Sequence, residues 1–126
     1  DVRSSPPVPG VRWEAEDLAA GLRLLRLLAN RPYCNQVTVI DVRNFAGRYI
    51  PGPEQPQLRI KAQVGQGRPT DIRWGRFPSP DGLDYCVSPE RKLQYLDVYY
   101  EQNDRRLAGV NTWIDLRYDK VYVSLN

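Results

Sequence analysis

The sequence predicts an α+β domain in which a mostly antiparallel sheet is packed with two helices. Two segments, at about 14–30 and 88–102, have helical periodicity, and several short segments alternate apolar and polar residues as strands do. Turn residues separate them in the order helix, strand, hairpin, helix and two strands. We expect residues 13–126 to form one such domain, after an extended, Pro-rich lead-in at residues 1–12.

The first helix is expected from about Glu14 to Asn30 and to end before Pro32. Its core stripe is predicted to comprise Leu18, Leu22, Leu25 and Leu28. This stripe is expected to pack on the sheet, and a surface for a partner helix is the alternative.

Strands are expected at 36–44, 57–64 and 70–74, with loops at about 45–56 and 75–82. The run Gly65-Gln66-Gly67 is typical of a hairpin turn, because a phosphate loop would need a third Gly and a following Lys. The second helix is expected to begin with Ser88 as its N-cap and Pro89 in its first turn. Its buried stripe is predicted to be Leu93, Leu96 and Tyr100.

Composition excludes several kinds of chemistry. The chain has no His, which is the commonest general base and zinc ligand, so we expect no metal, no cofactor and no enzymatic activity. A net charge of +3, spread along the chain, argues against a dedicated nucleic-acid binder. The chain begins at Asp1 and contains no Met, so we expect a processed or excised piece, and any anchor or targeting segment could have been removed from it.

Cys34 and Cys86 are the only thiols. A disulfide between them would close a loop of about 53 residues and stabilise the fold by roughly 4 kcal/mol. Two small buried hydrophobes are the alternative. We predict the Cys34–Cys86 bridge on the condition that the domain is exported to an oxidising compartment.

Two acidic residues have similar surroundings, Asp41 in Ile40-Asp41-Val42-Arg43 and Asp115 in Ile114-Asp115-Leu116-Arg117. Paired carboxylates roughly 5–10 Å apart would suit a cell-wall hydrolase. However, each Asp lies two residues from an Arg on the same strand face, which lowers its pKa and favours an exposed charge lattice.

A single-strand nucleic-acid platform is the alternative function. It would combine basic and aromatic side chains of the predicted hairpin, namely Arg59, Lys61, Arg73, Trp74, Arg76 and Phe77. Edge packing explains Trp74 and Phe77 equally well.

The C-terminal segment reads as two strands, Trp113–Asp119 and Val121–Leu125, around a short charged break. A terminal strand at a sheet edge exposes unpaired backbone donors and acceptors, to which an incoming strand can bind. We expect Tyr122 and Ser124 on one face and Val121, Val123 and Leu125 on the other, against the core. An edge blunted by Lys120 and used for nothing is the alternative.

In this order, the elements resemble the extracytoplasmic β domain of the bacterial cell-division family FtsQ/DivIB over roughly residues 6–125. The features that carry the resemblance are the Pro-x-x-x-Gly start at Pro6–Gly10, the Leu-rich helix at Gly21–Leu25, Ile40–Asn44, Ile72–Arg76, Glu90–Leu93 and, most specifically, Ile114–Asp119.

The resemblance implies a non-enzymatic, single-pass membrane protein of the divisome, acting in septum formation. Its outer domain, on the periplasmic face of the inner membrane, would bind FtsB-like and FtsL-like division proteins. It also implies an upstream membrane anchor and a small POTRA domain. We expect the partner site at the C-terminal edge strand, comprising Arg117, Tyr118, Lys120, Tyr122, Val123 and Ser124.

Overall fold

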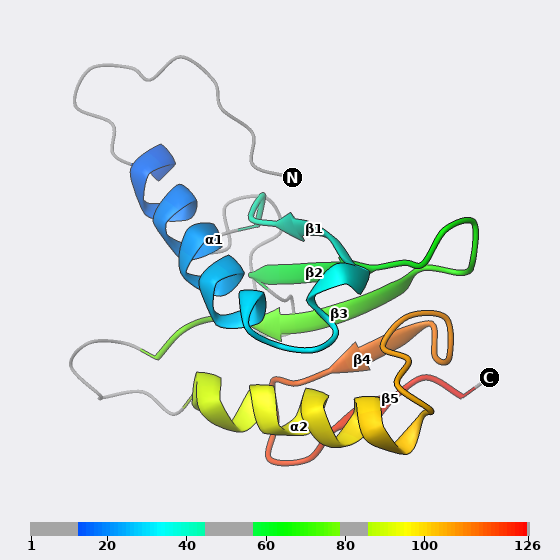
Figure 1. The fold of residues 1–126 in the computed structure, drawn as a ribbon. Helices are drawn as coiled ribbons and strands as arrows, with labels where there is room; N and C mark the ends of the chain where they lie inside the picture. The colour runs from blue at the N-terminus through cyan, green and yellow to red at the C-terminus, as the bar shows by residue number, and fades with distance from the viewer. Residues whose placement is uncertain (1–12, 45–56, 79–85, 126) are drawn as a thin grey trace.

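A computed structural model describes residues 13–44, 57–78 and 86–125 (Figure 1). The elements in chain order are α1 (Trp13–Ala29), the short 3₁₀ helix η1 (Cys34–Gln36), β1 (Val37–Asp41), β2 (Leu58–Ala62), β3 (Thr70–Gly75), α2 (Pro89–Gln102), β4 (Trp113–Asp115) and β5 (Tyr122–Val123). The predicted lead-in at 1–12 and the loop at 45–56 lie outside the described residues.

The five strands form one sheet in the order β1-β2-β3-β4-β5. Three of the four pairings are antiparallel, and β3 pairs with β4 in parallel. A parallel pair needs a crossover connection, and α2 lies in the chain between these two strands. The α+β class predicted from the sequence, with two helices and a mostly antiparallel sheet, is confirmed.

The register places one apolar side chain of each strand in a single row across the sheet. This row is Ile40, Ile60, Ile72, Ile114 and Val123. Its three central members are fully buried, in one core with leucines of both helices. The neighbouring row, on the opposite face, is polar: Asp41, Arg59, Arg73, Asp115 and Tyr122. The sheet therefore has an inner, helix-covered face and an outer, charged face.

Helix α1 packs on the core by a different side from the one predicted. Leu24 and Leu28 are buried, whereas Leu18, Leu22 and Leu25 are exposed. The prediction was right for Leu28 and wrong for the other three. Because leucines occupy most of the helix circumference, their spacing alone does not determine which of them meets the sheet.

Helix α2 begins as predicted. The Ser88 side chain accepts a hydrogen bond from the backbone N–H of Arg91 at 3.2 Å, and Pro89 follows the cap. The predicted stripe of Leu93, Leu96 and Tyr100 is buried. The sequence did not indicate that Lys92 is buried as well.

Asp97 of α2 joins the end of α1 to the second helix. It accepts hydrogen bonds from Arg31 at 2.6 Å and from the Tyr33 hydroxyl at 2.9 Å. The Tyr33 ring also packs on Tyr100, with centroids 5.4 Å apart. Burial and the adjacent Asp97 raise the pKa of Tyr33, so this hydroxyl remains a donor at neutral pH.

Candidate functional site

Strand β5 forms one edge of the sheet. It pairs with β4 on one side, and no described strand pairs with its other side. Figure 1 shows β5 beside β4, just before the C-terminus. An edge of this kind offers backbone groups to an incoming strand. The described part of the chain therefore places the predicted partner strand at a sheet edge.

The register identifies which residue of β5 presents its backbone outward. The N–H of Ser124 donates to the carbonyl of Trp113 at 3.1 Å, so these two residues form a hydrogen-bonded pair. The next pair, Ile114 with Val123, is then of the non-hydrogen-bonded type. The N–H and C=O of Val123 consequently point away from β4, toward the open side of the edge.

Ser124 anchors the end of the strand to the fold. Its hydroxyl oxygen accepts from the backbone N–H of Thr112 at 2.7 Å, and its carbonyl accepts from the Asn111 side chain at 2.9 Å. Asn111 in turn accepts from the Tyr99 hydroxyl of α2 at 2.6 Å. Ser124 is therefore buried, and its side chain holds the end of β5 to the fold.

The side chains around this edge are aromatic and apolar. Tyr118 and Tyr122 are exposed, and their rings meet edge to face with centroids 5.7 Å apart. Val123 and Leu125 are exposed as well, so the prediction that they pack on the core is wrong. Val121 is partly buried against the core as predicted. Val123 is the last member of the row of apolar side chains that crosses the sheet. Because its side chain is exposed, the edge has an apolar surface.

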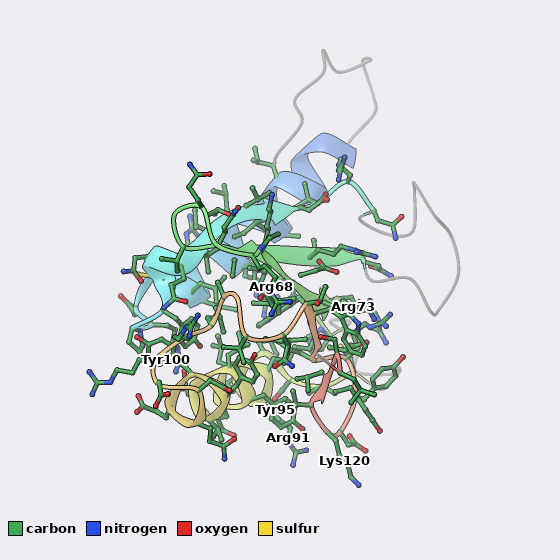
Figure 2. The ribbon with its side chains drawn as sticks, turned by 90° about the vertical axis from the view of Figure 1, so that its right-hand side faces the viewer. Arg68, Arg73, Arg91, Tyr95, Tyr100 and Lys120 are labelled. Atoms are coloured by element: carbon green, nitrogen blue, oxygen red, sulfur yellow. The ribbon has the colours of Figure 1, made fainter. Side chains whose placement is uncertain are left out.

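Lys120 lies at the tip of the connection between β4 and β5 (Figure 2). Its side chain is exposed. The connection is held against α2, because the Tyr95 hydroxyl donates a hydrogen bond to the carbonyl of Asp119. The edge strand is thus fixed at both ends, by Tyr95 and by Ser124.

Asp115 and Arg117 do not form the exposed charge lattice that the sequence suggested. The side chain of Asp115 is 5% exposed and that of Arg117 is 15% exposed, and they are joined at 2.8 Å. Burial raises the pKa of Asp115, but hydrogen bonds from Arg117 outweigh this effect and lower it overall. The two residues support the edge from within, since Asp115 pairs with Tyr122 across the sheet.

An aromatic group on the outer face was missed by the sequence analysis. The Arg73 guanidinium lies 4.3 Å from the centroid of the Trp113 ring, on neighbouring strands. Since Trp and Arg are the residues most enriched at binding hot spots, this stack extends the candidate surface inward from the edge. No pattern in the sequence indicates this contact, because it depends on the parallel pairing of β3 with β4.

The nucleic-acid platform is not assembled as proposed. Trp74 is fully buried on the inner face and packs near Phe77, so its ring is closed to a base. Arg59 and Arg73 lie on the outer face, where both are near Asp71, at 3.0 and 3.7 Å.

The carboxylate pair of a hydrolase is not assembled either. Asp41 and Asp115 belong to the first and fourth strands of the sheet, which corresponds to about 14 Å at ~4.8 Å per strand. That separation exceeds the range that glycoside hydrolysis uses. The run Gly65-Gln66-Gly67 forms the predicted hairpin turn, in which the N–H of Gly67 donates to the carbonyl of Val64 at 2.9 Å.

Cys34 and Cys86 are free thiols in this structure. Cys34 lies exposed in η1, and Cys86 precedes α2, where its sulfur is 3.3 Å from the carbonyl of Arg76. The predicted bridge is not formed in this structure. The alternative, two buried hydrophobes, is wrong for Cys34.

Among the described residues there is no group of three or more His, Cys, Asp or Glu arranged to hold a metal ion. No helix in the described part of the chain is long and apolar enough to cross a bilayer. Comparison of the chain with protein-family models, curated proteins and solved structures finds no significant match.

Proposed function

We propose that this domain is a non-enzymatic scaffold module that captures a partner protein by strand addition at β5. The observation that carries the proposal is the outward backbone of Val123 on an edge strand fixed at both ends. An incoming strand would hydrogen-bond to this residue and cover its apolar side chain. Tyr118 and Tyr122 would supply aromatic contact area on the outer face.

The setting we propose is bacterial cell division, which follows from the resemblance of the sequence motifs to FtsQ/DivIB. The partners would then be FtsB-like and FtsL-like proteins, met outside the cytoplasm by a chain anchored through an upstream segment. Within the candidate set, Val123, Tyr118 and Tyr122 make direct contact and Lys120 contributes charge at the rim. Arg117 and Ser124 act by holding the edge in place.

The test is a proline at position 123. Val123→Pro removes the outward N–H, which forms no bond to β4, so the domain keeps its fold and loses binding to the extracytoplasmic segments of the FtsB-like and FtsL-like proteins. Val123→Ala is the matched control, since it retains the N–H. Ser124→Pro serves as the contrast, because it removes the bond to Trp113 and lowers the melting temperature. Undiminished binding by folded Val123→Pro protein, measured by calorimetry, would rule out strand addition.

A further inference from the structure

A thiol and an amine share one backbone acceptor between the end of β3 and the start of α2. The sulfur of Cys86 lies 3.3 Å from the carbonyl oxygen of Arg76, and Lys92 Nζ donates to the same oxygen at 3.1 Å. Because both distances end at one oxygen, the sulfur and the nitrogen cannot be farther apart than the sum of the two. This pair takes no part in the proposed capture of a partner strand at β5.

Cys86 is placed to react with a small oxidant. It is partly exposed, and it precedes Ser88, the N-cap of α2, by two residues. Its surroundings are electropositive, since the Lys92 ammonium and the N-terminal end of α2 lie beside it. Reactive cysteines occupy partly exposed, electropositive positions, and peroxide oxidises such a thiol to a sulfenic acid.

Lys92 supplies a nitrogen that can attack the oxidised sulfur. Its backbone N–H donates to the carbonyl of Ser88 at 3.1 Å, which fixes it in the first turn of α2. Its side chain is 1% exposed, and Nζ is held by the Trp74 carbonyl at 2.6 Å as well as by that of Arg76. Burial lowers the pKa of Lys92 to about 8, so neutral amine, the form that attacks sulfur, is present at mildly alkaline pH.

We propose that Cys86 and Lys92 form a redox-sensitive covalent link, a sulfenamide that joins Sγ to Nζ. Hydrogen peroxide first transfers one oxygen atom to the thiol, which gives the sulfenic acid and water. The Nζ lone pair then attacks the sulfur, so that the S–N bond forms and the S–O bond breaks. The departing hydroxide takes up the proton that the nitrogen loses and leaves as a second water. The sulfur loses the two electrons that the peroxide gains.

The link changes how the start of α2 is held, and it is reversible. The Lys92 ammonium donates to the carbonyls of both Trp74 and Arg76, whereas a sulfenamide nitrogen carries one hydrogen and keeps at most one of these bonds. The link also removes a buried positive charge and ties the segment before the N-cap to the first turn of the helix. Two molecules of a small thiol restore the cysteine and the amine and leave as a disulfide.

Peptide mapping after peroxide treatment at pH 8 tests the proposal. The Cys34→Ser protein is used throughout, because Cys34 is the only other thiol and would otherwise form a disulfide with the same change in mass. Peroxide is expected to lower the mass of this protein by about 2 Da, since two hydrogen atoms leave, and dithiothreitol to restore it. Trypsin cuts after Arg91, which separates Cys86 from Lys92 unless the two are linked. We therefore expect one joined peptide pair under non-reducing conditions.

Lysine variants identify the nitrogen. Lys92→Met is expected to abolish the link and to leave Cys86 as a sulfenic acid, which dimedone traps. Lys61→Met is the matched control, because Lys61 is exposed in β2 and its loss should leave the link unchanged. Circular dichroism verifies that each variant is folded, and if Lys92→Met is not, the peptide map of the Cys34→Ser protein decides alone. Peroxide that only adds oxygen to Cys86, or that joins it to Lys61 or Lys120, overturns the proposal.

Discussion

Two copies of one four-residue pattern, Ile-Asp-apolar-Arg, begin in strands β1 and β4, and they differ chiefly in burial. In each, the Arg backbone N–H donates to the Asp side chain two residues earlier, at 2.9 Å for Arg43 and 3.1 Å for Arg117. In each, the guanidinium also donates hydrogen bonds to both carboxylate oxygens, those of Asp41 in one copy and of Asp115 in the other. The local geometry is thus the same at both places.

Their surroundings differ because β1 is an edge strand and β4 is an interior strand. At β1, the side chains of Asp41 and Arg43 are 22% and 56% exposed. At β4, Asp115 and Arg117 are almost covered, and Arg73 approaches the same carboxylate at 3.8 Å. In both motifs burial raises the Asp pKa and the Arg bonds outweigh it, so the net shift is downward. A short pattern thus determines the contact, while its place in the sheet determines how much the contact stabilises.

The largest expected difference comes from removing the base of each motif. Arg117→Ala leaves a buried carboxylate without its main partner, and we expect a loss of about 3 kcal/mol. For a domain of this size, that corresponds to a fall in melting temperature of about 10 °C. This replaces the expectation from sequence that Arg117 belongs to an exposed charge lattice. Thermal and urea unfolding measure the effect. A loss below 1 kcal/mol would show that burial of the β4 motif, Ile114–Arg117, does not make its ion pair more stabilising than an exposed one.

The next prediction concerns Lys92 of α2, whose pKa is influenced by the charges of Asp115 and Arg117 in the β4 motif. Its ammonium donates to the carbonyls of Trp74 at 2.6 Å and Arg76 at 3.1 Å. Burial lowers its pKa to about 8, with smaller opposing effects from Cys86 and Asp115, which raise it, and from Arg76 and Arg117, which lower it.

Because the folded pKa of Lys92 lies below the unfolded value, the unfolded chain binds more protons between pH 8 and 10.5. Stability relative to Lys92→Met should therefore rise with pH across that window, by about 3 kcal/mol. The raised pKa values of Tyr33 and Tyr99 act in the opposite direction at higher pH, and comparison with the Met variant at each pH cancels them. If the difference in unfolding free energy between the unmodified chain and Lys92→Met did not change from pH 7 to 10.5, a charged, buried Lys92 would be contradicted.

The parts of this fold that the sequence predicted are those that local chemistry determines. Ser88 followed by Pro89 marks the start of α2 because the cap bond spans only three residues. The turn at Gly65 is also determined by a single residue, because glycine adopts its positive φ of 55° without strain. The order of elements and the α+β class follow from such signals.

The parts that the sequence did not predict depend on distant neighbours. The exposure of Leu22 and the burial of Leu24 follow from how α1 meets the sheet, and both residues fit a helical stripe. The burial of Asp115 and the outward amide of Val123 require the pairing of β4 with β3 on one side and β5 on the other. No short pattern carries that information, because strand register is a long-range property.

Gly75 connects the β4 motif to the end of β3 and gives a further test. Its φ is +93°, and a Cβ there would lie 2.8 Å from Arg117 Cγ and 3.6 Å from Lys92 Nζ. Gly75→Ala should cost about 2–3 kcal/mol, from backbone strain and displacement of the Arg117 side chain. Gly65→Ala is the matched control: its φ is also positive, but no atom lies within 4 Å, so strain alone costs about 1 kcal/mol. Equal losses at the two glycines would mean that Arg117 moves aside freely.

The smallest effect is expected at the β1 motif, where Arg43→Ala should cost less than about 0.5 kcal/mol. Arg43 is exposed and Asp41 is partly exposed, so water reaches the carboxylate when the guanidinium is removed. Salt should reduce even this loss, because the Debye length falls to about 3 Å at 1 M and screens exposed pairs. The loss for Arg117→Ala should remain nearly constant under the same change, since ions do not reach the covered pair. Urea unfolding of both variants at 0.05 M and 1 M NaCl separates the two motifs. A salt-independent loss above 1 kcal/mol for Arg43→Ala would show that the β1 motif, like its counterpart in β4, is shielded from solvent.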